Sequence, residues 1–398
     1  MAASIPVSLA AINVSKLLTL LVAGGALIGA LWRKERSAQL AQLRSVPVLL
    51  AMLAALTLSL AYTTAPWHDA LGDIGKYGKL LLIPAVVVLI RTPREARLAL
   101  GVYLGFQAFI VLTSWLLFLQ VPVFWGSPTP RNSIATVYSS YLDQSIMTAA
   151  FAAICWQLRD KFPGRQGPWI AVTLAAMAAV NVMVMLPGRS GQVALLGVIA
   201  VTLAWALPPR WLAAALLAPV LLAGLAMVLA PQFNKRVMQV ASEVNAYRYQ
   251  DDATSSSGLR LNFWRRSLQA IAQRPLTGYG VGSWNQQYLR LEGDAPIPGT
   301  TDIRNPHQEF LLWTVTLGVA GGVLLTAFLA SAVRDTRGFP RPTRRAAQSL
   351  LAVLIMTCMI NSALFDALIG DFFCGVLGLL LAYGLYNPDD PAPSPAPA

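Results

Sequence analysis

Charged side chains are scarce in this chain. Asp, Glu, Lys and Arg make up 12% of its 398 residues, against about a quarter in a soluble domain, and 56% of the residues are hydrophobic. Apolar runs of roughly 20 residues recur, and each is long enough for a helix to cross a bilayer. The alternating segments of about ten residues that mark a membrane barrel are absent. The sequence therefore predicts an all-α polytopic membrane protein.

Histidine and cysteine are also rare, with two and three residues. Cys155, Cys358 and Cys374 lie in apolar runs, which predicts neither a disulfide framework nor a metal site. The chain has no HExxH motif, no pair of histidines spaced as metal ligands and no P-loop. "GYGVGSW" follows no strand, so it is not a dinucleotide-binding fingerprint. We expect chemistry that uses no metal and no cofactor.

Positive charge is concentrated between the apolar runs, with a formal net charge of +12. "RKERSAQLAQLR", "RTPREAR", "RDKFPGR" and "RDTRGFPRPTRR" are short and strongly basic, which is typical of cytoplasmic loops. The charge thus indicates topology, and we expect no nucleic-acid partner. With these loops as guides we predict eleven spans, or twelve with a re-entrant piece near the start: 10–31, 46–62, 71–90, 98–121, 138–158, 169–186, 192–207, 211–230, 307–331, 348–364 and 370–387.

A long hydrophilic segment interrupts the apolar runs and must lie on the side opposite to the basic loops. It gives four predicted regions: an N-terminal transmembrane bundle, the outer segment, C-terminal transmembrane helices and a disordered cytoplasmic tail, at 1–230, 231–306, 307–387 and 388–398. In the outer segment we predict two helices, the second over about 258–273. Five of its residues fall on one helical face: Arg260, Trp264, Leu268, Ile271 and Ala272.

Two arginines are candidates for binding an anion. Arg189 lies in "LPGRSGQ", a short turn between two apolar runs, where a guanidinium is costly unless it meets a headgroup, a carboxylate or an anionic ligand. The following helix begins near Ser190, and its backbone donors add to a plausible pyrophosphate site. Arg260 is either a snorkelling arginine or a clamp on a phosphate. Both readings stay open on the residues alone.

His307 in "RNPHQEFLLW" starts a predicted span on the outer side. Its imidazole either caps the helix or acts as a general base, since its unperturbed pKa is about 6.5. His68 in "APWHDALGD" lacks comparable context and is expected to be structural. Asp366 and Asp371 flank the last outer turn, where they orient a partner or are solvated. Secondary candidates are Arg131, Arg265, Trp264 and Gln308.

Two stretches resemble a known family when they are taken in order. "SGLRLNFWRRSLQAIAQRPLTGYGVGSW" is followed some 20 residues later by "NPHQEFLLWTVTLGVAGG". Together they resemble the O-antigen ligase and polymerase superfamily, which has Arg-x-x-x-Trp on a periplasmic helix, a Pro-Leu-x-Gly-x-Gly turn, a His-Asn/Gln-x-x-Leu motif and Leu-Gly-x-x-Gly. "LPGRSGQ" is similar to the family's upstream arginine turn. In this chain Gln308 replaces the commoner asparagine after the histidine.

The resemblance implies a bundle related to the C-type glycosyltransferases, in the bacterial inner membrane, with its active site facing the periplasm. It also implies an undecaprenyl-pyrophosphate-linked glycan as donor and no metal requirement. Arg189 and Arg260 match the arginines that bind the donor pyrophosphate, and His307 matches the essential histidine. The implied partners are undecaprenyl-pyrophosphate-linked O-antigen, a lipid A–core acceptor and membrane lipids.

Our leading interpretation is an O-antigen ligase that is metal-independent and inverting. The alternative is an O-antigen or exopolysaccharide polymerase whose acceptor is a second lipid-linked glycan. A protein O-glycosyltransferase usually carries a larger C-terminal extension. A transporter or flippase should carry ionisable residues deep within its spans, and few are present here.

Overall fold

The computed structural model describes residues 9–32, 38–125, 135–250, 252–293 and 297–386. These residues form helices and connections, with no strand among them. The predicted tail at 388–398 lies outside them. The α-helices run in this order: α1 (Leu9–Trp32), α2 (Ala38–Ala41), α3 (Ser45–Leu58), α4 (Trp67–Tyr77), α5 (Leu82–Leu89), α6 (Pro93–Phe118), α7 (Tyr141–Gln157), α8 (Gly167–Val180), α9 (Arg189–Ala206), α10 (Leu212–Leu229), α11 (Pro231–Gln250), α12 (Ser256–Gln273), α13 (Trp284–Glu292), α14 (Glu309–Leu317), α15 (Val319–Asp335), α16 (Arg341–Ile360) and α17 (Ala367–Leu385).

Seven helical segments of the described chain are long and apolar enough to cross a membrane. They correspond to seven of the eleven predicted spans, and the fold class is confirmed. The segments are Pro93–Phe118, Gly167–Met185, Arg189–Ala206, Pro209–Leu229, Val319–Gly338, Arg341–Ile360 and Ala367–Leu385. The other four predicted spans fall on α1, on α3, on α7 and on the pair α4–α5. A 3-10 turn, η2 (Gly78–Leu81), divides α4 from α5, so the predicted span 71–90 is not one helix.

The predicted span 307–331 is also broken, at Gly318. This glycine has φ +66°, and a Cβ there would lie 2.3 Å from the carbonyl oxygen of Leu276. The turn "PLTGYG" packs against the break: the amides of Tyr279 and Gly280 donate to the carbonyls of Val315 and Thr316, each at 2.9 Å. Two of the motifs that suggested the family therefore meet in space. The turn satisfies carbonyls that the interrupted helix leaves free.

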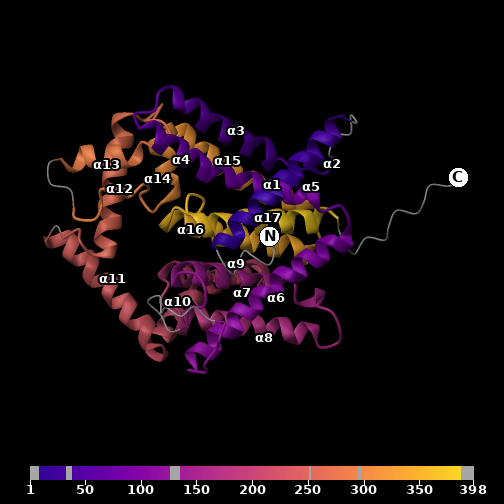
Figure 1. Cartoon of the computed structure of the whole chain (residues 1–398). Coiled ribbons are helices and arrows are strands. Elements are labelled where there is room, and N and C mark those ends of the chain that lie inside the picture. The colour runs from indigo at the N-terminus through magenta and orange to yellow at the C-terminus, as the bar shows by residue number, and fades with distance from the viewer. Residues whose placement is uncertain (1–8, 33–37, 126–134, 251, 294–296, 387–398) are drawn as a thin grey trace.

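Helix α17 is the centre of the bundle. It is buried along nearly its whole length and packs against α5, α6, α7 and α16 (Figure 1). Because α17 begins directly after the connection 361–366, the central helix holds that connection in place.

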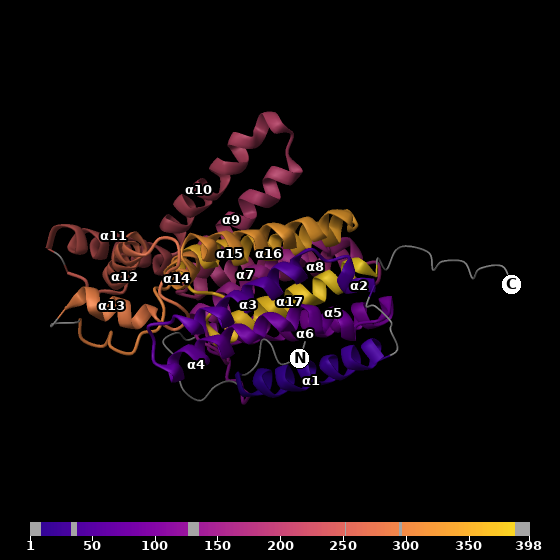
Figure 2. The same cartoon turned by 90° about the horizontal axis from the view of Figure 1, so that it is seen from above.

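One end of the bundle, here called the loop end, comprises α4, α11, α12, α13, α14 and the connection 361–366 (Figure 2). The connections after α5 and α15 lie at the far end of the bundle. Helix α12 runs across the loop end, at a steep angle to the bundle axis (Figure 1).

The outer segment differs from its prediction in two respects. Its described residues form three helices where two were predicted, and the additional helix is α13. The face assigned to α12 was partly wrong: Leu268 is 57% exposed, whereas Phe263, Ser267 and Ala270 are buried. The reason is α13, whose Trp284 donates its indole N–H to the Ser267 hydroxyl at 2.8 Å and draws that face inward.

Candidate functional site

Arg189 is the first residue of α9, and two glycines set its position. A Cβ on Gly188 would lie 2.1 Å from the Ser145 hydroxyl oxygen of α7, and one on Gly191 would lie 2.4 Å from it. Only glycine lets the two backbones approach this closely. The sequence "PGRSG" thereby holds the start of α9 against the start of α7 at the loop end.

The Arg189 guanidinium reaches across to the outer segment. Nη1 donates to the Ser257 hydroxyl at 2.8 Å and lies 3.4 Å from a carboxylate oxygen of Glu243. Glu243 also accepts from the Ser257 amide at 3.0 Å. Burial alone would raise the pKa of Glu243, but the Ser257 hydrogen bonds and the Arg189 charge outweigh it and leave this pKa below its usual value. Arg189 therefore couples the bundle to α11 and α12.

Arg260 lies in the first half of α12 and is only partly exposed. Among the described residues it forms no hydrogen bond or ion pair. Burial lowers its pKa, and the positive charge of Arg189 lowers it further, while Tyr141 and Asp366 act in the opposite direction. Ser257, which Arg189 contacts, lies three residues before Arg260 on α12, so the two arginines meet the same face of that helix. A partly buried guanidinium with no acidic partner is costly, and an anion bound between the two arginines would remove that cost.

His307 occupies the connection between the outer segment and α14. Its φ is +51°, which is uncommon for a residue with a Cβ and implies local strain. Two contacts hold it there: its own amide donates to the Asn305 side-chain oxygen at 2.9 Å, and the Trp264 indole donates to the Pro306 carbonyl at 3.1 Å. The motif tryptophan thus fixes the backbone next to the motif histidine.

The His307 ring contacts a short series of hydrogen-bonded polar side chains in the connection 361–366. Nδ1 lies 3.2 Å from Oδ1 of Asn361, whose Nδ2 donates to an Asp366 carboxylate oxygen at 3.1 Å. Oδ1 also accepts from the Ser362 amide at 3.0 Å. These bonds orient the Asn361 amide with its oxygen toward the imidazole, so Nδ1 must carry the hydrogen. In the neutral ring Nε2 then keeps its lone pair, and no described residue hydrogen-bonds to it.

The electrostatic environment favours that neutral ring. Burial lowers the pKa of His307, and the nearby Arg260 charge lowers it further, whereas the Asn361 hydrogen bond raises it. An imidazole with a free Nε2 and a depressed pKa can accept a proton at neutral pH. Arg260 also acts on Asp366, where its charge opposes the rise in pKa that burial causes. Arg260 therefore acts electrostatically on both the histidine and the Asp366 carboxylate.

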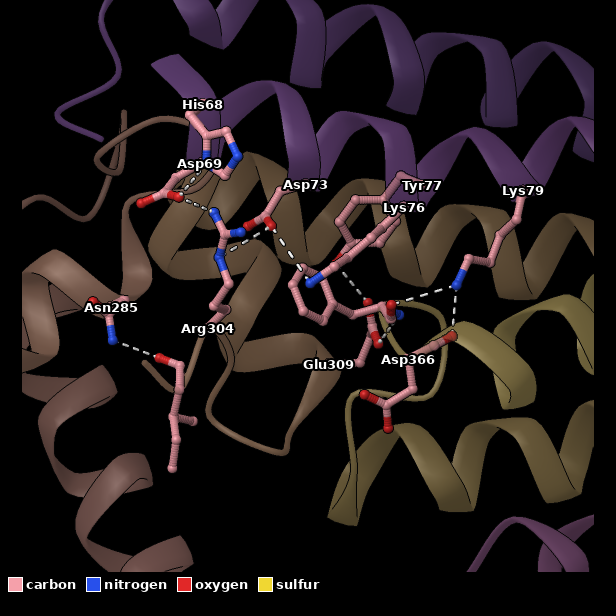
Figure 3. Close-up of polar contacts among 12 residues, drawn as sticks. His68, Asp69, Asp73, Lys76, Tyr77, Lys79, Asn285, Arg304, Glu309 and Asp366 are labelled. Atoms are coloured by element: carbon pink, nitrogen blue, oxygen red, sulfur yellow. Dashed lines mark hydrogen bonds and ion pairs between the residues drawn. The ribbon is translucent and has the colours of Figure 1, made fainter. Parts of the chain in front are cut away.

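Two buried ionisable side chains hold the connection 361–366 from opposite sides (Figure 3). The Glu309 carboxylate, fully buried, accepts from the amides of Leu364 and Phe365 at 2.9 and 3.3 Å, and from the Tyr77 hydroxyl at 2.8 Å. The Lys79 ammonium, also buried, donates to the Asp366 carbonyl at 2.5 Å. Their contacts with backbone fix the connection that carries Asn361 and Asp366.

Helix α4 fastens the outer segment through a separate ion pair. Arg304 lies 2.6 Å from an Asp69 carboxylate oxygen and 3.8 Å from one of Asp73, and Figure 3 shows its side chain between the two acids. His68 has a side chain that is 92% exposed and contacts only its neighbour Asp69 among the described residues, at 3.2 Å. Neither contact involves the His307 region.

The remaining candidate residues from the sequence lie in different surroundings. Arg131 lies outside the described residues, and Arg265 is exposed on α12. The Gln308 side-chain oxygen caps α14 by accepting from the Leu311 amide at 2.5 Å. Asp371 is neither solvated nor in the outer turn: it is fully buried inside α17 and pairs with Lys16 of α1 at 2.8 Å.

Sequence reasoning missed Asn361, Glu243, Glu309 and Lys79. A signal existed for two of them. Glu309 and Lys79 each stand at the edge of an apolar run, where an ionisable side chain needs a specific partner. Asn361 and Glu243 had no such signal, because only the tertiary fold brings them beside His307 and Arg189.

The fold and this site together define an all-α polytopic membrane protein with two neighbouring arginines and a histidine at its loop end. Residues 172–326 match the family described as O-antigen ligase. This segment is thus similar to O-antigen ligases, and the resemblance predicted from the motifs is confirmed. The matched segment includes Arg189, Arg260 and His307, whereas Asn361 and Asp366 lie beyond it. No curated protein matches the chain.

Proposed function

We propose that the protein is an O-antigen ligase. It transfers polysaccharide from undecaprenyl pyrophosphate to a sugar hydroxyl of lipid A–core, in the bacterial inner membrane with the loop end facing the periplasm. The observation that carries this proposal is the arrangement along one face of α12 at the loop end. Arg260, without a partner among the described residues, lies one helical turn from Ser257, which Arg189 contacts. It also lies one turn from Trp264, whose indole donates to the Pro306 carbonyl beside His307, and no described residue hydrogen-bonds to Nε2 of that histidine.

In the proposed reaction the acceptor hydroxyl oxygen attacks the anomeric carbon of the donor sugar. The bond from that carbon to the pyrophosphate oxygen breaks, and its electron pair leaves with the undecaprenyl pyrophosphate. The hydroxyl proton goes to Nε2 of His307. Attack from the face opposite the leaving group inverts the anomeric configuration.

The two arginines have the role of stabilising the leaving group. Negative charge grows on the pyrophosphate as the bond breaks, and guanidinium groups already in place lower the energy of that state. Asn361 holds the imidazole in the tautomer that leaves Nε2 able to accept the proton. Asp366 orients Asn361 in turn.

The experiment that tests the function is gel analysis of lipopolysaccharide from a deletion strain carrying plasmid copies of the chain. For a ligase, the deletion removes O-antigen from lipid A–core and polyprenyl-linked polymer accumulates. A single capped repeat on the core would instead mean the polymerase. His307→Ala should fail to complement, while His68→Ala, at the other histidine of the same end, should complement fully. Complementation by His307→Ala would show that His307 is not the general base.

A further inference from the structure

A polar hollow of about 500 Å³ lies at the loop end, away from the histidine. Six of its lining residues are Thr64, Gln273, Arg274, Tyr279, Gln287 and Arg290. They come from the connection before α4, the end of α12, the glycine turn and α13. No Asp or Glu is among the described residues that line it.

Hydrogen bonds fix the floor of this hollow. Gln287 is buried; its Nε2 donates to the Thr64 hydroxyl at 3.1 Å, and its Oε1 accepts from Nε of Arg290 at 2.9 Å. Gln273 accepts from the Tyr279 hydroxyl at 3.2 Å and from the Arg290 guanidinium. The side chains of Gln273, Gln287 and Arg290 are therefore held in place before any ligand arrives.

Two guanidinium groups converge on the hollow. Those of Arg274 and Arg290 lie 4.9 and 6.0 Å from the centre of the Tyr279 ring. Neither forms an ion pair with a described acidic residue. Two guanidinium groups over one ring and without a counter-charge suit a phosphate or a carboxylate, and the glutamine amides beside them suit sugar hydroxyls.

The hollow is too far from the two candidate pyrophosphate arginines to be part of their site. Arg260 and Gln273 are 13 residues apart on α12, which at ~1.5 Å per residue separates their backbones by roughly 20 Å. Because α12 lies across the end of the bundle, this separation is largely sideways (Figure 1).

We propose that this hollow binds an anionic sugar, bearing a phosphate or a carboxylate, of the acceptor glycan. The proposal rests on the proposed function, since it assigns the two substrates to the two ends of α12. The donor pyrophosphate binds at Arg260, and the acceptor's charged sugar binds at Arg274 and Arg290. The acceptor then extends from the hollow toward His307.

The first test is binding, which needs no turnover. Purified protein in phosphatidylcholine nanodiscs is titrated with glucose 6-phosphate, glucose and inorganic phosphate. Glucose 6-phosphate should bind more tightly than either fragment, and the Arg274→Gln/Arg290→Gln variant should weaken it at least tenfold. The control is Lys235→Gln/Arg248→Gln, which removes the same charge from exposed positions of α11 and should leave binding unchanged. Equal loss in both variants would mean nonspecific charge and would overturn the proposal.

Phosphatidylglycerol nanodiscs distinguish the two sources of a phosphate. If the lipid headgroup occupies the hollow, phosphatidylglycerol will abolish glucose 6-phosphate binding, and the proposal fails. If the hollow is a sugar site, binding persists in those nanodiscs.

The second test is kinetic. The Arg274→Gln/Arg290→Gln variant should raise the KM for lipid A–core at least tenfold, with the donor KM and kcat unchanged. Arg274→Gln alone, at an exposed side chain with no hydrogen bond of its own among the described residues, should show part of the effect without loss of thermal stability. An unchanged acceptor KM would overturn the proposal. If the unmodified protein transfers nothing, the proposed function fails, whereas the binding result still decides whether the hollow takes anionic sugars.

Discussion

His307 and Asn361 are 54 positions apart in the chain, yet Nδ1 of the imidazole and Oδ1 of the amide lie 3.2 Å apart. The contact joins the motif segment to a connection outside it and fixes which ring nitrogen carries the hydrogen. Removing the amide should therefore affect the proton transfer and not the binding of the donor.

Asn361→Ala should lower kcat by about 10- to 100-fold, because the imidazole loses the acceptor that sets its tautomer and orientation. The donor KM should change little. Steady-state kinetics with lipid-linked donor checks this, with the melting temperature as a control for folding. A fall in activity explained wholly by a higher donor KM would contradict the role given to Asn361.

The acid limb of the pH–rate profile should report His307. Its pKa is depressed by burial and by Arg260, so the neutral base persists below the usual His range and activity falls only as the pH drops through that lowered pKa. Arg260→Gln removes one lowering influence. The pKa should then rise and the acid limb should move to higher pH, as measured by kcat/KM between about pH 4.5 and 8.5, a range of about two units on either side of the ordinary value of about 6.5. An acid limb that stays at the same pH would mean that Arg260 does not influence the pKa of His307.

Arg189 should tolerate lysine better than glutamine, but not fully. Lysine keeps the positive charge and loses the planar fork that can hold two pyrophosphate oxygens. We expect kcat/KM for the donor to fall about tenfold in Arg189→Lys and about 100-fold in Arg189→Gln. Equal activity of the lysine variant and the unmodified protein would show that charge alone is needed.

Glu309 should matter to folding as well as to activity. Glu309→Ala leaves the Leu364 amide, the Phe365 amide and the Tyr77 hydroxyl without their acceptor in a buried site, at a cost on the order of 3 kcal/mol. The melting temperature in detergent should fall clearly. Asp302→Ala removes an exposed acid from the outer segment and should leave it unchanged. Glu309→Gln, which keeps an oxygen acceptor, should recover part of the loss.

Cysteine labelling can test the orientation of the loop end. The native cysteines are all buried, so a new thiol at an exposed position can be read separately. A membrane-impermeant maleimide should label Thr301→Cys in cells whose outer membrane is permeabilised. Arg337→Cys, in the connection after α15, should react only after lysis. The opposite pattern would place the site on the cytoplasmic side.

Motif order singled out Arg189, Arg260 and His307 as candidates, because each belongs to a short sequence pattern with its own local structure. The supporting contacts were not predictable in this way. Asn361 reaches His307 only after α16 and α17 have packed, and the buried face of α12 depends on a helix, α13, that has no apolar run. The spans containing η2 and Gly318 were read as continuous because hydropathy does not register a local break in backbone direction.

The contact between Gly188, Gly191 and Ser145 has a further consequence. The location of the Arg189 charge depends on the lack of a side chain at Gly188 and at Gly191. An alanine at either position would overlap Ser145 and push α9 away from α7. A chain could therefore keep every charged residue of this region and still carry its guanidinium in the wrong place. The absence of two methyl groups thereby specifies where the Arg189 guanidinium lies.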